Sequence, residues 1–341
     1  MNLIKFLKGY KKNNYTYIIA EACDNHFGNI KKAKKMVWLA KKAGADCIKF
    51  QHHLVDEEML KNVPKSSNFD LTLYEFLEKY SLKLSDHQKL KKYCKKVGIQ
   101  YLCTPFSYKA AFELKKYVGV DCFKIGSGEL TDLPSLQKIS KLKKPMILST
   151  GMSTTSEIKR SFNLLKKNTN ISLMHCLSEY PANYSDLNLK YLEVLNKKYN
   201  KSVIGYSDHT DDIYSSIAAV SLGARIIEKH VILNKKMKGP DQKVSIDFDQ
   251  LISLVKGVRL LERSFGDIKK IHNKEIQIRR WATRSIVAIK NIKKGEKLSF
   301  KNIWTKRPGT GIPSSKFNSI IKKKAKKNIK INSLLKYSDI K

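Results

Sequence analysis

Two histidines end neighbouring strand-like runs in the middle of the chain. Val203–Thr210 (VIGYSDHT) reaches His209, and Ile226–Val231 (IIEKHV) reaches His230, with a helix-like segment at 211–223 between them. In a β-α-β unit the two strands would be parallel neighbours about 4.8 Å apart, which brings both imidazoles to one rim. They could hold one divalent cation with positions open for catalysis, or they could be buried histidines that bond to backbone carbonyl groups.

Further chemically useful side chains stand at the ends of the other strand-like runs. They are Glu21, Lys49, Gln51, Thr104, Lys124, Ser127, Glu129, Ser178, Tyr180 and Ser207. Lysines and hydroxyl groups suit a phosphate and a carboxylate, because charge-assisted hydrogen bonds to anions are strong, and the glutamates are candidate proton carriers. Any one of these residues could be structural, but the set predicts metal-assisted carbon–carbon bond formation or cleavage on a phosphorylated anion. A Schiff-base aldolase that uses Lys49 or Lys124 stays open.

The elements that must position these residues alternate regularly. The expected strands are Tyr15–Cys23, Asp46–His53, Ile99–Phe106, Cys122–Glu129, Pro145–Met152, Ile171–Pro181, Ser202–Thr210 and Ala224–Leu233. The expected helices are 29–44, 85–97, 108–118, 133–142, 154–167, 188–199, 211–223 and 247–264. Eight β-α units in roughly 250 residues, with no GxGxxG turn after the first strand, favour a TIM barrel over an open doubly wound sheet. In that fold the active site is built at the C-terminal ends of the strands, where the polar residues stand.

One connection is longer than the others. Residues 54–84 separate the second strand from the next helix, and loops beyond roughly 12–15 residues are usually functional or disordered. The segment contains the apolar residues Phe69, Leu73, Tyr74, Phe76 and Leu77. They predict a packed lid that carries a short helix.

The amino-acid composition indicates which binding partners and which cellular compartment to expect. The 67 Lys and Arg against 30 Asp and Glu give a formal net charge of +37, which suggests nucleic-acid binding. The lysines, however, line the polar faces of nearly every helix-like segment, with no aromatic-interleaved basic stripe or zinc finger, so we expect no nucleic-acid partner. Six cysteines without a CxxC pair suggest reduced thiols, and no run approaches the roughly 18 apolar residues of a membrane span. We expect a soluble cytoplasmic protein.

The chain changes character after residue 265. We expect a TIM-barrel domain at 1–265, a polar linker at 266–282 and a small domain at 283–341. Residues 291–303 resemble residues 328–340, which fits a pseudo-symmetric domain, although the second copy has Asn332-Ser333 where the first has Gly295-Glu296, a difference that can alter its turn. Between the copies a Pro/Gly loop presents Arg307.

In this order along the chain, these motifs resemble the sialic acid synthase (N-acetylneuraminate synthase) family. The matching runs are Ile18–Glu21 with Asn25-His26, Ile48–Gln51, Thr104–Phe106, Lys124–Glu129, Ser149–Met152, Tyr180-Pro181, Gly205–Thr210, Glu228–His230, Gly239–Asp241 and Lys306–Gly309. The resemblance implies a TIM barrel followed by an antifreeze-protein-like (SAF) domain, in a domain-swapped homodimer. It also implies condensation of phosphoenolpyruvate with N-acetylmannosamine and release of phosphate. The alternative is a legionaminic or pseudaminic acid synthase that acts on a 6-deoxy di-N-acetylated hexose.

The same resemblance implies roles for single residues. His209 and His230 would hold Mn²⁺, which activates the sugar aldehyde. Phosphoenolpyruvate would contact Lys49, Thr104, Lys124, Ser127 and Ser207, whereas the amino sugar would face Glu21, Gln51, Asn68, Tyr180 and Asp241. Arg307 would come from the other subunit and meet the N-acetyl group. Ser178 stands where some members of the family carry an asparagine that contacts the phosphate.

Overall fold

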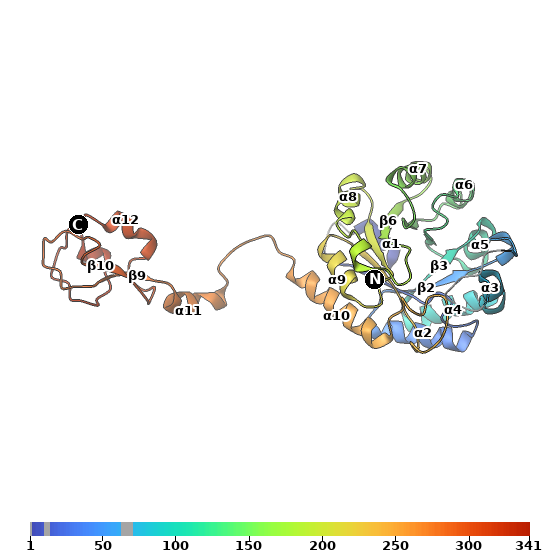
Figure 1. Ribbon diagram of the computed structural model, residues 1–341, viewed down its shortest axis with the longest axis horizontal. Helices are drawn as coiled ribbons and strands as arrows, with labels where there is room; N and C mark the ends of the chain where they lie inside the picture. The colour runs from blue at the N-terminus through green and yellow to red at the C-terminus, as the bar shows by residue number, and fades with distance from the viewer. Residues whose placement is uncertain (1, 10–13, 63–70) are drawn as a thin grey trace. The chain divides into compact units, whose positions relative to one another are not determined.

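The computed structural model describes residues 2–9, 14–62 and 71–341 (Figure 1). It divides into two compact units, Met1–Phe265 and Gly266–Lys341. Within the described ranges, no helix is both long and apolar enough to cross a membrane.

The first unit is an eight-stranded parallel barrel, as expected. Its strands are β1 (Tyr17–Glu21), β2 (Cys47–His52), β3 (Gln100–Pro105), β4 (Phe123–Ile125), β5 (Met146–Ser149), β6 (Ile171–Cys176), β7 (Ile204–Asp208) and β8 (Ile226–His230). They pair in the order β3-β2-β1-β8-β7-β6-β5-β4, and β3 and β4 lie side by side, which closes the ring. The pairing of β1 with β8 sets Glu21 opposite His230.

Helices surround the strands (Figure 1). They are α2 (Ile30–Ala43), α4 (Leu84–Val97), α5 (Tyr108–Glu113), η3 (Leu114–Val118), α6 (Leu133–Ser140), α7 (Thr155–Leu165), α8 (Tyr191–Lys198), α9 (Tyr214–Ser221) and α10 (Phe248–Ser264). Helix α2 illustrates why they form. The side chain of Asn29 accepts from two backbone N–H groups of the first turn, and Gly44 ends the helix in the left-handed conformation that glycine adopts without strain. Its lysines face away from the buried side.

The alternation of side chains along each strand makes two layers inside the barrel. The lower layer is apolar and includes Tyr17, Ile19, Cys47, Leu102 and Ile147. Two residues further along the strands, the same inward direction is taken by polar side chains, because successive residues of a strand point to opposite faces. Helix α1 (Leu3–Gly9), which the sequence analysis did not predict, packs Leu3 and Phe6 against the lower layer.

The connection after β2 contains the predicted short helix. A 3₁₀ turn, η2 (Val55–Glu57), precedes α3 (Leu73–Tyr80), and the hydroxyl of Tyr74 donates to Asp56 at 2.7 Å. Phe76 and Leu77 are buried. Residues 63–70, which include the predicted anchor Phe69, lie outside the described residues, and the lid itself stays a prediction.

The second unit begins with α11 (Asn273–Ala282) and continues with an antiparallel pair, β9 (Ser285–Ala288) and β10 (Ile303–Lys306). The remaining elements are η5 (Ser314–Lys316), α12 (Phe317–Ile320) and η6 (Tyr337–Asp339). The sequence echo has a structural counterpart, because Ile292 and Ile329 exchange both backbone hydrogen bonds. The equivalent turn positions Gly295 and Asn332 both have left-handed backbone, with φ 83° and 62°. Asparagine tolerates this conformation, so the turn is not altered.

Candidate active site

A cavity of about 300 Å³ opens at the C-terminal ends of the barrel strands. Thirteen of the predicted residues line it: Glu21, Lys49, Gln51, Thr104, Lys124, Ser127, Glu129, Ser178, Tyr180, Ser207, His209, His230 and Asp241. They come from all parts of the barrel sequence and meet because their strands end at one rim. Asn68 lies outside the described residues, and Arg307 belongs to the second unit, where it is exposed.

Two buried lysines share one carboxylate on the floor of the cavity. Nζ of Lys49 is 3.2 Å and Nζ of Lys124 is 3.7 Å from Oε1 of Glu228. Lys49 also donates to Thr104 at 3.1 Å, and Lys124 donates to Ser149 at 2.6 Å. Burial opposes ionisation of Glu228, but the two ammonium groups outweigh it and lower its pKa. The floor therefore holds two cations for one firmly ionised carboxylate, which suits a polyanionic ligand.

Glu21 differs from Glu228 because burial dominates its environment. Its Oε2 is 3.3 Å from Nζ of Lys49, and Nε2 of Gln51 donates to its Oε1 at 3.0 Å. Burial raises the pKa of Glu21 to about 7, although the charge of Lys49 acts in the opposite direction. Burial also raises the pKa of Glu129, whose Oε2 is buried and has no hydrogen-bond partner in the part of the chain that the structure describes. A glutamate with a pKa of about 7, such as Glu21, can hold or release a proton near neutral pH.

The two histidines stand beside this floor, with ring centroids 5.3 Å apart. Nδ1 of His209 lies 2.7 Å from the carbonyl of Leu177, so it must carry the proton and donate. In the neutral imidazole Nε2 is then the lone-pair nitrogen, and the hydroxyl of Tyr180 lies 3.1 Å from it. Burial lowers the pKa of His209, but the Cys176 thiol and the Leu177 carbonyl outweigh it and raise the pKa to about 8, so a cation bound at Nε2 would displace a proton. Burial, together with the charges nearby, lowers the pKa of His230 well below its usual range. His230 is consequently a neutral imidazole.

These residues fit a divalent cation. Nδ1 of His230 is buried and has no hydrogen-bond partner among the described residues. The Leu177 carbonyl fixes the tautomer of His209 in the manner of the outer partners that orient metal-bound histidines. Neutral imidazole and carboxylate groups are ligands of divalent transition metals, and Asp241 lines the same cavity.

Glu228 is the residue that sequence reasoning undervalued most, since it entered only as the first residue of the matching run Glu228–His230 and was given no role. It stands two residues before His230 on one strand, so the alternation of the strand sends both side chains inward. Ser149 likewise stands two residues after Ile147 of the lower layer, so its side chain also points into the barrel. Asp208, in contrast, points outward and accepts from Ser215, Ser216 and Thr210. It is a structural residue.

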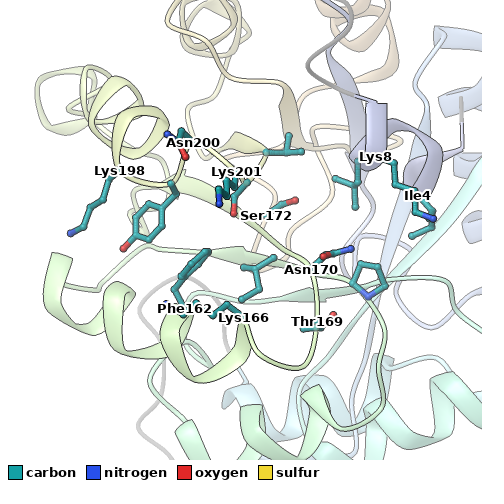
Figure 2. A pocket seen from close by; sticks show the side chains of 16 residues that line it. Ile4, Lys8, Phe162, Lys166, Thr169, Asn170, Ser172, Lys198, Asn200 and Lys201 are labelled. Atoms are coloured by element: carbon teal, nitrogen blue, oxygen red, sulfur yellow. The ribbon is translucent and has the colours of Figure 1, made fainter.

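A second cavity, of about 640 Å³, lies where the strands begin (Figure 2). Figure 2 shows Ile4 and Lys8 on one side of it and Lys198 and Lys201 on the other. Of the predicted site residues that the structure describes, none lines it. The described residues around it are basic, apolar and neutral polar, with no carboxylate or histidine, so the smaller cavity is the one equipped for acid–base chemistry.

Known proteins resemble the chain over most of its length. Residues 36–270 match the model of the NeuB family, and residues 283–341 match that of the SAF domain. N,N'-diacetyllegionaminic acid synthase of Campylobacter jejuni is 41% identical over 332 residues, which cover 94% of this chain and 99% of that protein. Pseudaminic acid synthase of the same species is 35% identical and covers 97% of this chain and 98% of that protein. The crystal structure of N-acetylneuraminic acid synthetase from Leptospira borgpetersenii superposes with a TM-score of 0.70 at 31% identity, over 78% of this chain and 90% of that one.

Proposed function

The chain belongs to the NeuB family, and on that premise we propose that it condenses phosphoenolpyruvate with a 6-deoxy di-N-acetylated hexose, releasing phosphate and a legionaminic-type sugar acid. The single observation that carries the chemistry is the pair of buried lysines around Glu228 beside two histidines. Sequence similarity favours this acceptor, the alternative of the sequence analysis, over N-acetylmannosamine. A legionaminic relative is 41% identical to the chain, whereas the neuraminic acid synthetase structure is 31% identical.

In this proposal the floor of the cavity binds phosphoenolpyruvate. Lys49 and Lys124 would contact its phosphate and carboxylate, with hydroxyl donors from Thr104, Ser127 and Ser207. The two ammonium groups are already held in position by Glu228, so little side-chain freedom is lost on binding. His209 and His230 would hold a divalent cation, which polarises the sugar aldehyde as a Lewis acid when bound.

The proposed reaction forms one carbon–carbon bond and breaks one carbon–oxygen bond to phosphate. The methylene carbon of phosphoenolpyruvate forms a bond to the aldehyde carbon, and the aldehyde oxygen becomes a hydroxyl by taking one proton. Water adds at the carbon that carried the phosphate ester, the carbon–oxygen bond to phosphate breaks, and a 2-keto acid results. Glu21, whose pKa burial raises to about 7, would donate the proton to the new hydroxyl.

A Schiff-base aldolase is the second candidate, because burial lowers the pKa of Lys124 and a neutral amine is what such an enzyme needs. Borohydride reduction in the presence of pyruvate and the sugar would then attach a stable adduct to Lys124. The condensation reaction predicts no adduct.

The acceptor is tested by initial rates of phosphate release. Phosphoenolpyruvate and a divalent cation are supplied with either the 6-deoxy di-N-acetylated hexose or N-acetylmannosamine. We expect kcat/KM for the first acceptor to be at least about tenfold higher, the difference made by about 1.4 kcal/mol of transition-state binding. A preference for N-acetylmannosamine would reject the proposed acceptor.

A further inference from the structure

A thiol, an imidazole and a carboxylate meet at the edge of the active-site cavity. Among the described residues, Cys23, His230 and Asp241 each place a ligand atom within 4.8 Å of the other two. Cys23 follows β1, His230 ends β8, and Asp241 lies in the loop after β8. Because Glu21 is paired with His230 in the barrel, the segment that carries Cys23 is fixed next to His230.

The three groups are close enough for one ion. Ligand atoms that share a tetrahedral cation at roughly 2.0–2.3 Å lie about 3.3–3.8 Å apart, so small side-chain movements would bring these three into a coordination sphere. Cys23 is fully buried, and so is Nδ1 of His230, which has no hydrogen-bond partner within residues 2–9, 14–62 and 71–341. A buried polar atom without a partner calls for a ligand that supplies one.

The backbone conformation of Cys23 and the place of its thiol also support a ligand role. Cys23 has φ 37°, a left-handed conformation that costs a non-glycine residue roughly 1–2 kcal/mol and that is often found at functional sites. Its thiol sulfur lies within 4.8 Å of a carboxylate oxygen of Asp241. A divalent cation could replace the thiol proton, because thiolate and carboxylate together balance its charge.

We propose that Cys23 is a ligand of the active-site cation, together with His230 and Asp241. The proposal deepens the proposed function, since it concerns the cation of the same cavity. A thiolate is a soft ligand, so the site would bind Zn²⁺ and Co²⁺ in preference to Mg²⁺. Cys176 is a thiol that lines the cavity itself, but its sulfur lies 3.7 Å from Nδ1 of His209, the protonated nitrogen that cannot bind a metal.

The test is optical titration of the full chain with Co²⁺ alone. Thiolate ligation gives a near-ultraviolet charge-transfer band that imidazole and carboxylate ligation do not give. We expect the band in the wild type and in Cys176→Ser, and we expect its loss in Cys23→Ser. Calorimetric titration should show Zn²⁺ affinity reduced at least about tenfold in Cys23→Ser, since even outer partners of a metal site are worth 10–100-fold. Circular dichroism checks that each variant is folded.

Each outcome is decisive. Co²⁺ binding without the band, a band that survives Cys23→Ser, or no binding of Co²⁺ would overturn the proposal, and loss of the band in Cys176→Ser would assign the thiolate to Cys176. The titration uses neither substrate, so its failure and the failure of the proposed function are distinguishable. A protein that lacks the band but releases phosphate from phosphoenolpyruvate keeps the function and loses the thiolate ligand.

Discussion

In the proposed function, Lys124 is the residue on which binding of phosphoenolpyruvate depends most directly, since it lies on the floor of the cavity and contacts Glu228 and Ser149. Replacing it by methionine keeps the length of the side chain and removes one charge-assisted hydrogen bond, worth about 1.5–3 kcal/mol. We expect kcat/KM for phosphoenolpyruvate to fall roughly 10–150-fold in Lys124→Met. Steady-state kinetics measures the change.

Lys229→Met is the matched control for Lys124→Met. Lys229 is equally buried, but it pairs with Asp208 at 3.2 Å on the outer side of the barrel. This variant should be less stable and should keep a KM for phosphoenolpyruvate within about twofold of the wild type. Equal losses of phosphoenolpyruvate affinity in both variants would mean that the floor lysines do not bind the anion.

His26 should make the barrel sensitive to acid. Burial lowers its pKa from 6.5 to about 4, and its Nδ1 accepts from the N–H of Gly28 at 3.1 Å. Between these two pH values His26 is protonated in the unfolded chain and neutral in the folded chain. The contribution of His26 to stability therefore falls as the pH falls. Asparagine can present its Oδ1 to the same N–H. Between pH 7.5 and pH 5 the wild type should lose about 2 kcal/mol more stability than His26→Asn, measured by urea unfolding. Parallel losses in the two proteins would show that His26 does not carry the effect.

Residue types alone predicted which side chains line the cavity where strand alternation and strand ends coincide. Lys49 with Gln51 follows this pattern, and so does Ser207 with His209. Glu228 was undervalued because a carboxylate next to lysines along the chain has an ordinary explanation as a surface ion pair. Only the fold shows that it faces Lys49 and Lys124 instead of its sequence neighbour Lys229.

At the scale of elements, the outward face of β7 secures the start of α9. Asp208 accepts from Ser215 and Ser216 of the helix and from Lys229 of β8, all buried. This network holds the turn in which His209 stands. We expect Asp208→Asn to cost about 3–5 kcal/mol, because it leaves the ammonium group of Lys229 buried without a counter-charge.

The double variant Asp208→Asn with Lys229→Met should recover at least half of that loss, since it removes the uncompensated charge. Urea unfolding of the two single variants and the double variant measures the coupling. Strictly additive losses would contradict the network.

The order and type of the barrel elements were predictable, whereas their ends were not. β6 ends at Cys176, although the run that suggested it continues to Pro181, because polar site residues follow a strand without belonging to it. Helix α1 escaped prediction because only Leu3 and Phe6 make its buried face. Helix α11 has no buried residues, so its sequence lacks the apolar periodicity that would predict a helix. It lies in the stretch that was expected to be a linker.

At the scale of the whole molecule, the predicted domain-swapped homodimer leads to a testable prediction, namely that Arg307 acts at the barrel of the other subunit. Its Nε donates to the carbonyl of Ala282, and its guanidinium is exposed on the loop after β10. If Arg307 completes the site of the partner barrel, mixed dimers of Lys124→Met and Arg307→Ala subunits contain one intact site each. Co-expression of the two variants should then restore about a quarter of the wild-type activity, since half of the dimers are mixed.

Activity in the co-expressed sample is assayed at low acceptor concentration, where each variant alone is weak. Each purified variant serves as the control. A mixture no more active than the mean of the two variants would place Arg307 at its own barrel or at no site.

The stoichiometry of the reaction tests the central claim most directly. The purified chain with a divalent cation, phosphoenolpyruvate and the 6-deoxy di-N-acetylated hexose should form one phosphate and one nine-carbon 2-keto acid for each phosphoenolpyruvate consumed, and chelation with EDTA should stop both. Phosphate without the sugar acid, or the sugar acid made from pyruvate through a borohydride-trapped adduct on Lys124, would contradict the account.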